Sequence, residues 1–81
     1  MKYIICEDFS GKPVPFLFPD KVAHMDMREQ LPYANVLSAG YVALESGRFV
    51  CSGGDKDLGR TSRPEVDATC LTEFFTRQGL L

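Results

Sequence analysis

Between residues 36 and 65, segments suited to β-strands alternate with residues that favour turns, and this stretch constrains the fold more than any other part of the chain. Residues 36–44 and 48–52 contain β-branched and aromatic side chains, and Ser46-Gly47 separates the two segments. Two such segments joined by a short turn with glycine are typical of a β-hairpin. The sequence therefore predicts two antiparallel strands here, followed by a loop with glycines and charges of both signs.

The loop leads into a predicted helix that begins near Arg63. The tetrapeptide Ser62-Arg63-Pro64-Glu65 matches a capping box, in which Ser62 is the N-cap and Glu65 reaches back from the third helical position. Gly79 suits the end of such a helix. Apolar residues recur between these two signals at helical spacing, which predicts one buried face made of Val66, Cys70, Leu71, Phe74 and Phe75.

The first half of the chain predicts two more strands and a short helix. Residues 2–9 are rich in β-branched and aromatic side chains, a turn follows, and residues 14–18 return as a second strand. Proline cannot donate a ladder hydrogen bond, so the second strand is expected at a sheet edge because of Pro13, Pro15 and Pro19. Asp20 is the expected cap of a helix over residues 21–31, which Pro32 ends.

These elements occur in the order ββαββα and predict a single α+β domain over residues 1–81, with an antiparallel or mixed four-stranded sheet and two helices packed on it. Alternation along the first strand places Tyr3 and Ile5 on one face and Ile4 and Cys6 on the other. Both faces are thus partly apolar. Either the helices divide between the faces or a second subunit covers one of them, and the second option predicts a homodimer.

Composition narrows the function classes. The formal net charge is −2 with both signs interspersed, so no field favours a nucleic acid or an anionic membrane. The three cysteines are widely spaced and form no Cys-x-x-Cys pair, which indicates reduced thiols and neither a disulfide framework nor a metal site. The apolar run near the N-terminus is too short for a signal peptide or a membrane span. We therefore expect a cytoplasmic protein with no cofactor.

Residues 52–63 are the predicted site, because burial does not explain glycines and mixed charges there. The candidate binding residues are Ser52, Gly53, Gly54, Asp55, Lys56, Asp57, Arg60 and Arg63. The side chains of Lys56, Arg60 and Arg63 could bind an anion near the start of the second helix. Asp55 and Asp57 could instead form ion pairs with these cations. Residues 54–61 also resemble a P-loop with arginine in place of lysine. The later helix start and the two acids argue against nucleotide hydrolysis.

Two further side chains could carry chemistry. His24 is the only histidine, and its neighbour one helical turn on is Arg28, so a solvent-facing position or a simple polar contact is expected. Cys51 precedes the glycines, where an exposed thiol beside cations could be reactive. It shares a strand face with Phe49, however, so we expect it to fill the core, and we expect Cys70 to be buried on the second helix.

The second half of the chain resembles a group of short uncharacterised proteins encoded in bacteriophages and prophages. The resemblance lies in Ser38-Ala-Gly-Tyr-Val42, the Gly47 turn, Cys51-Ser-Gly53, Asp57-Leu-Gly59 and Ser62-Arg-Pro-Glu65. In that group a strand with SAG[FY] precedes a glycine and serine loop and an SRPED helix start. Asp55 and Asp57 replace expected serines here, and Val66 replaces an acid. The resemblance implies a phage or prophage setting in a bacterial cytoplasm, without a defined activity.

Two functions are therefore expected from the sequence. The first is a small non-enzymatic interaction protein, an adaptor or inhibitor, that binds another protein through residues 52–63 and the start of the second helix. The alternative is a small-molecule or anion-binding module built on the glycine loop with Lys56, Arg60 and Arg63. Nucleic-acid binding is a third class, and the charge balance makes it the least favoured.

Overall fold

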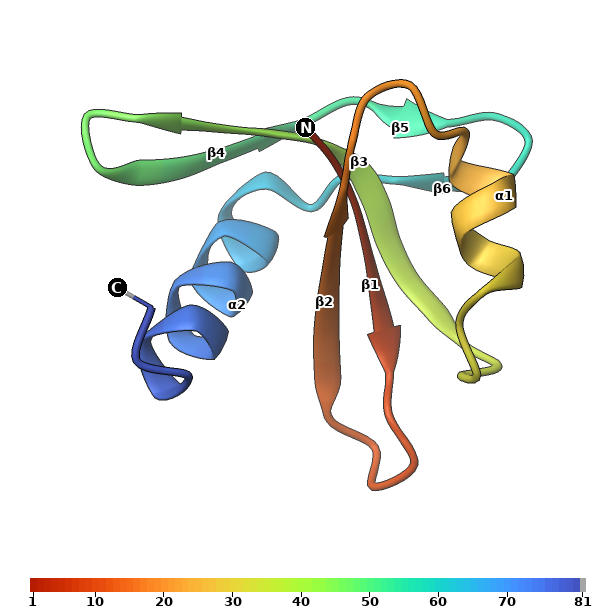
Figure 1. Cartoon of the computed structure of the whole chain (residues 1–81), viewed down its shortest axis with the longest axis horizontal. Coiled ribbons are helices and arrows are strands. Elements are labelled where there is room, and N and C mark those ends of the chain that lie inside the picture. The colour runs from red at the N-terminus through yellow and green to blue at the C-terminus, as the bar shows by residue number, and fades with distance from the viewer. Residues whose placement is uncertain (81) are drawn as a thin grey trace.

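The protein is described here by a computed structural model that places residues 1–80. Four strands form one sheet in the order β2-β1-β3-β4, and a second, two-stranded sheet pairs β5 with β6 (Figure 1). The strands are β1 (Lys2–Glu7), β2 (Pro13–Phe18), β3 (Val36–Glu45), β4 (Arg48–Ser52), β5 (Gly54–Asp55) and β6 (Arg60–Thr61). The helices are α1 (His24–Glu29) and α2 (Pro64–Arg77). The predicted α+β class is confirmed.

Every strand pair is antiparallel, which decides between the antiparallel and mixed sheets that the sequence allowed. β2 is an edge strand, as its prolines predict, because a missing N–H is tolerated on the side that has no neighbour. The β3–β4 hairpin turns at Ser46 and Gly47, which both have positive φ. Positive φ at both central residues is the geometry of the tight turn that matches strand twist, so this hairpin is also confirmed.

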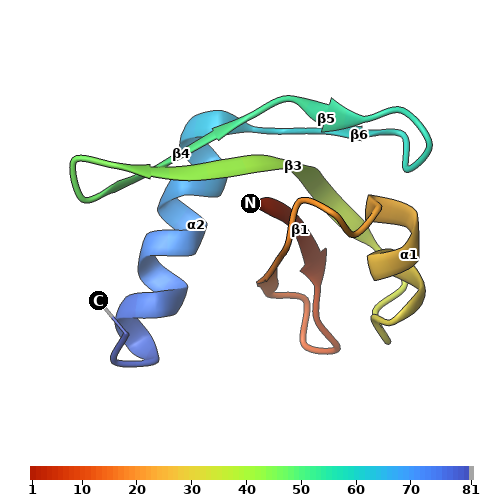
Figure 2. The same ribbon diagram turned by 45° about the horizontal axis from the view of Figure 1, so that its top comes forward.

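The two helices cover opposite faces of the sheet, which is the first of the two predicted solutions. On one face Tyr3 and Ile5 pack with Leu71 of α2. On the other face Ile4 and Cys6 pack in a cluster that Met27 of α1 joins. α1 and α2 are accordingly well separated in both ribbon views (Figures 1 and 2). A single chain does not test the homodimer, which stays a prediction.

A β-bulge in β3 controls which of its side chains face α2. Ile5 pairs with Ser38 and Cys6 pairs with Val36, so Leu37 is an extra residue in β3. An extra residue shifts the alternation of the bulged strand. Val36 therefore joins the cluster under α1, whereas Leu37 and Ser38 both face α2.

The predicted start of the first helix is wrong. α1 begins at His24, after Ala23, and no side chain caps it. Asp20 is instead paired with the N-terminal ammonium, its Oδ1 lying 3.2 Å from the nitrogen. The residues before α1 form a turn in which the Val22 N–H donates to the Pro19 carbonyl. Asp20 therefore lies outside the helix, beside the start of β1, and has an ionic partner in place of the capping role.

The capping box of the second helix is wrong by one residue, although the helix itself is confirmed. Arg63 is the N-cap of α2, Pro64 is at its first position, and no N-cap side chain makes a capping bond. The Arg63 N–H donates to the Asp67 carboxylate at 2.8 Å, so Asp67 takes the role expected of Glu65. The predicted end holds, because Gly79 has φ 75° and the Leu80 N–H donates to the Phe75 carbonyl. Within residues 1–80, neither helix combines the length and apolarity that crossing a membrane requires.

Candidate functional site

Most of the predicted loop is an ordered β-hairpin, which we call the β5–β6 arm (residues 53–62). Gly54 pairs with Thr61 and Asp55 with Arg60. At the base of the arm the Ser62 N–H donates to the Gly53 carbonyl at 2.8 Å. Figure 2 shows the arm extending from the end of β4 toward the α1 side of the molecule. The predicted site is therefore an ordered hairpin with its own backbone pairing.

Two glycines allow the close backbone contacts on which the arm depends. A Cβ at Gly54 would lie 2.8 Å from the Arg60 carbonyl oxygen, which is too close for any other residue without a shift of β6. A Cβ at Gly40 in β3 would collide with the Ser52 carbonyl oxygen at the point where β4 leads into the arm. These glycines serve the close approach of two chains.

The turn of the arm is fixed by Asp55 and Arg60. The Asp55 Oδ2 accepts a hydrogen bond from the Leu58 N–H at 2.9 Å, and the Asp55 carbonyl accepts one from the Gly59 N–H at 2.9 Å. The Arg60 Nε donates to the Val36 carbonyl at 2.8 Å. Leu58 packs against the core cluster under α1. Both charged residues thus hold the arm in place instead of being free to bind a ligand.

A hollow of about 370 Å³ lies on the arm. Its lining residues are Gly54, Asp55, Lys56, Gly59, Arg60 and Thr61. Lys56 and Asp57 are exposed at the tip, and Ser52 and Gly53 are exposed at the base. Seven of the eight predicted site residues therefore lie on the arm or directly before it, and an accessible surface exists there.

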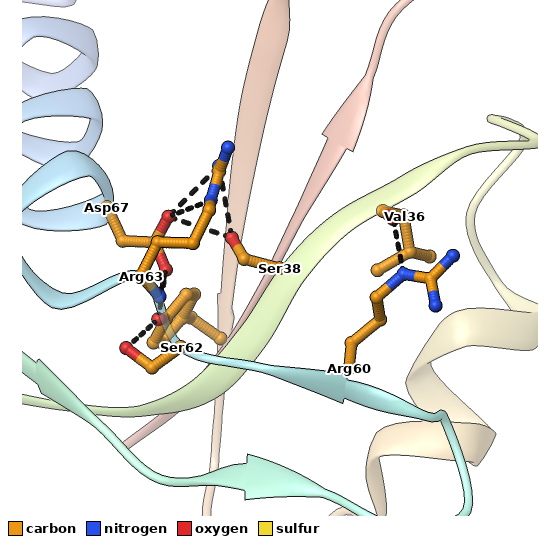
Figure 3. Close-up of polar contacts among 7 residues, drawn as sticks. Val36, Ser38, Arg60, Ser62, Arg63 and Asp67 are labelled. Atoms are coloured by element: carbon orange, nitrogen blue, oxygen red, sulfur yellow. Dashed lines mark hydrogen bonds and ion pairs between the residues drawn. The ribbon is translucent and has the colours of Figure 1, made fainter.

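Arg63, the eighth predicted residue, belongs to a different environment. Its Nε and Nη2 each lie 3.0 Å from Oδ1 of Asp67, and Nη2 donates to the Ser38 Oγ at 3.2 Å. Figure 3 shows Arg60 on β6 and Arg63 at the start of α2, with their guanidinium groups well apart. The structure does not combine the two arginines into one cation cluster.

Asp67 is the centre of a buried polar network that sequence reasoning missed. Its side chain is fully buried, and it accepts hydrogen bonds from the Tyr3 hydroxyl, the Ser38 Oγ at 2.8 Å and Arg63. The Tyr3 oxygen also lies 2.7 Å from the Ser62 Oγ. The network joins β1, β3 and α2 to the base of the arm. The only signal in the sequence was an arginine four residues before an aspartate in the first turn of a helix.

Burial governs the acid–base state of this network and of its neighbour Cys51. Desolvation, followed by the bond to Asp67, raises the pKa of Tyr3 far above its usual range, so the hydroxyl stays protonated. Desolvation, followed by the charge of Asp67, raises the pKa of Cys51 to about 11. Cys51 is 4% exposed, which confirms that it fills the core, and a protonated thiol is a poor nucleophile. Cys70 is partly buried, and burial raises its pKa too.

His24 is not solvent-facing. It is 1% exposed and lies between the rings of Phe18 and Tyr41. Its Nε2 is 3.0 Å from the Gly40 carbonyl oxygen, and its Nδ1 is 3.5 Å from Oδ1 of Asp55. Of the two predicted environments, the solvent-facing position is wrong, and the simple polar contact is confirmed by the Gly40 carbonyl. The contact with Asp55 connects His24 to the predicted site.

A second, wider hollow of about 610 Å³ lies between the β3–β4 turn and α2, and its polar side chains are all exposed. No bond like those of Asp55 and Arg60 to backbone groups is seen among the described residues that line it. Within residues 1–80, no group of three or more histidine, cysteine, aspartate or glutamate side chains is arranged to hold a metal ion. No protein-family model, no curated protein and no solved structure matches the chain.

Proposed function

We propose that the chain is a small non-enzymatic interaction protein that binds another protein through the β5–β6 arm and the adjoining start of α2. The observation that supports this proposal is the division of roles within the arm. Asp55 and Arg60 satisfy backbone groups, whereas Lys56 and Asp57 face solvent. A surface that is ordered before binding loses less conformational entropy when a partner docks on it.

The arm fits a protein partner better than an anion. Arg63 is paired with Asp67, and Arg60 uses its Nε and Nη1 on the carbonyls of Val36 and Gly59. Among these candidate cations, only the Lys56 side chain makes no hydrogen bond or ion pair within residues 1–80, and Asp57 follows it directly. One free ammonium beside a carboxylate is a weak anion site, but adjacent charges of opposite sign suit a protein surface of mixed charge.

The two side chains singled out for chemistry, Cys51 and His24, are not available at the surface of the arm. The Cys51 thiol is buried and protonated, and the His24 ring is closed off between two aromatic rings. Neither side chain lines the hollow on the arm. An adaptor or inhibitor that acts by binding alone requires no such group. The resemblance to short phage and prophage proteins supports a setting in the cytoplasm of a bacterial host.

A capture experiment tests this function. We expect the unmodified protein to retain a bacterial protein that a variant with Lys56→Glu and Asp57→Lys fails to retain, because the exchange alters the charge pattern of the tip and leaves the arm's anchors intact. Lys12→Glu, at an exposed position in the β1–β2 turn, is the matched control and should capture the same protein as the unmodified chain. If the unmodified protein, the arm variant and the control all captured the same proteins, the arm would not be the binding surface.

The anion-binding alternative has a separate measurement. Inorganic phosphate and nucleotides are added to the purified protein, and the melting temperature is recorded. On our proposal the temperature does not change. A rise that disappears in Lys56→Ala would assign the hollow to an anion and replace the interaction proposal.

A further inference from the structure

The Nδ1 atom of His24 is a buried polar atom without a hydrogen-bond partner among the described residues. The other ring nitrogen, Nε2, faces the Gly40 carbonyl oxygen at 3.0 Å. A carbonyl oxygen only accepts hydrogen bonds, so Nε2 carries the proton in the neutral ring. Nδ1 of the neutral ring is then an acceptor.

This acceptor faces a second acceptor. Oδ1 of Asp55 is 3.5 Å from Nδ1, whereas Oδ2 of the same carboxylate already accepts the Leu58 N–H. Two acceptors facing each other in a buried place repel. A proton on Nδ1 converts the same contact into an attraction between an imidazolium and a carboxylate, and an approach of about 0.6 Å would make it a charge-assisted hydrogen bond.

We propose that His24 and Asp55 form a proton-operated latch between α1 and the β5–β6 arm. When Nδ1 holds a proton, the arm is fastened to the body of the protein. When Nδ1 loses it, the arm keeps its remaining anchors but gains mobility. The control of partner binding by this latch rests on the proposed function, whereas the latch itself does not.

The surroundings of His24 leave Asp55 as the group that senses the proton. The other ionisable side chains on the elements around it are Lys2, Tyr3, Cys6 and Glu7 of β1, Asp26, Arg28 and Glu29 of α1, Tyr41 and Glu45 of β3, and Arg60 of β6. The Lys2 ammonium donates to the Val22 carbonyl at 2.9 Å. The Arg28 guanidinium donates to the carbonyls of Leu31 and Ala34. β2 contributes the uncharged Phe18 ring.

The chain is well suited to a direct test, because His24 is its only histidine and gives a single set of imidazole NMR signals. The protonation of His24 and the hydrogen-exchange protection of the Leu58 and Ser62 amides are followed from pH 5 to pH 8. We expect the protection factors of both amides to fall about tenfold as His24 loses its proton, which is the effect of one hydrogen bond to a charged group. Protection that stays constant through this titration would overturn the latch.

Asp55→Asn provides the decisive variant. The asparagine oxygen can still accept the Leu58 N–H, and its amide can donate to the neutral Nδ1, so the contact is bonded when the ring is neutral, whereas a protonated Nδ1 would face a second donor. We therefore expect protection that no longer falls as His24 loses its proton. Asp57→Asn is the matched control, since it removes the same charge two residues away at an exposed position, and it should keep the pH dependence. An Asp55→Asn protein with the unmodified pH dependence would refute the proposal. These measurements use the isolated protein without a binding partner. A failure of the latch would therefore not decide whether the arm binds another protein, which the capture experiment tests separately.

Discussion

At the scale of single residues, Asp67 has the most demanding environment in the protein. A fully buried carboxylate must replace all its lost hydration, and here donors come from Tyr3, Ser38 and Arg63. These donors arrive from three separate elements. The carboxylate can therefore be satisfied only when the sheet, α2 and the base of the arm are all in their native positions.

The first prediction concerns this carboxylate. Asp67→Ala leaves the Arg63 guanidinium and two hydroxyl groups without their common acceptor, so the free energy of unfolding should fall by about 3 kcal/mol or more. Urea denaturation measures the change. Asp57→Ala, at an exposed position, should change it by less than about 0.5 kcal/mol. Equal effects of the two substitutions would show that Asp67 is not buried in the folded protein.

The second prediction concerns the pH dependence that Tyr3 produces. Its pKa in the folded protein lies above the ordinary value of 10.0, so the unfolded chain releases the phenolic proton first as the pH rises. A group with a raised folded pKa contributes stability that is lost with increasing pH, here from about pH 10 upward, by up to about 1.4 kcal/mol per pH unit. Tyr3→Phe should lower stability at neutral pH and flatten this alkaline slope. If the unmodified protein and Tyr3→Phe lost stability equally with rising pH, the Tyr3 hydroxyl would not be buried as described.

At the scale of elements, local patterns identified the strands, and long-range partners decided the helix starts. Alternating apolar side chains and turn residues lie within a few positions of one another, so β2, β3 and β4 follow from the sequence. Ser62 could not be placed in this way, because its partner Tyr3 is 59 residues away. His24 and Asp55 are likewise far apart in the sequence and meet only through the tertiary structure. Local patterns therefore set the position of the candidate segment, residues 52–63, but not the separation of Arg63 from Arg60 or the contact of Asp55 with His24.

The third prediction uses the helix start. A capping box would make Glu65 important, whereas in the structure Glu65 is exposed and Asp67 receives the N–H of the N-cap residue. Glu65→Ala should therefore change the free energy of unfolding by no more than about 0.5 kcal/mol, through the loss of a favourable charge near the helix start. Loss of a functional cap would cost about 1 kcal/mol. Thermal or urea unfolding distinguishes the two values, and the larger one would restore the capping box.

At the scale of the whole molecule, β1 belongs to both cores. Its side chains alternate between the cluster under α2 and the cluster under α1, and it is hydrogen-bonded to β2 on one side and β3 on the other. Each helix therefore packs on a sheet that the other helix also stabilises. A domain of this size buries too little surface for two independent cores, so the two faces should fold as one cooperative unit.

The last prediction tests this cooperativity with two adjacent residues of one strand. Ile4 and Ile5 are both fully buried but face opposite cores, so Ile4→Ala removes packing under α1 and Ile5→Ala removes it under α2. Each should lower the free energy of unfolding by about 2 to 5 kcal/mol. Each should also shift the whole urea transition with an unchanged slope, whether helix content or the Tyr3 environment is monitored. If either variant instead unfolded in two steps, with one helix lost before the other, the two cores would be independent and β1 would not join them.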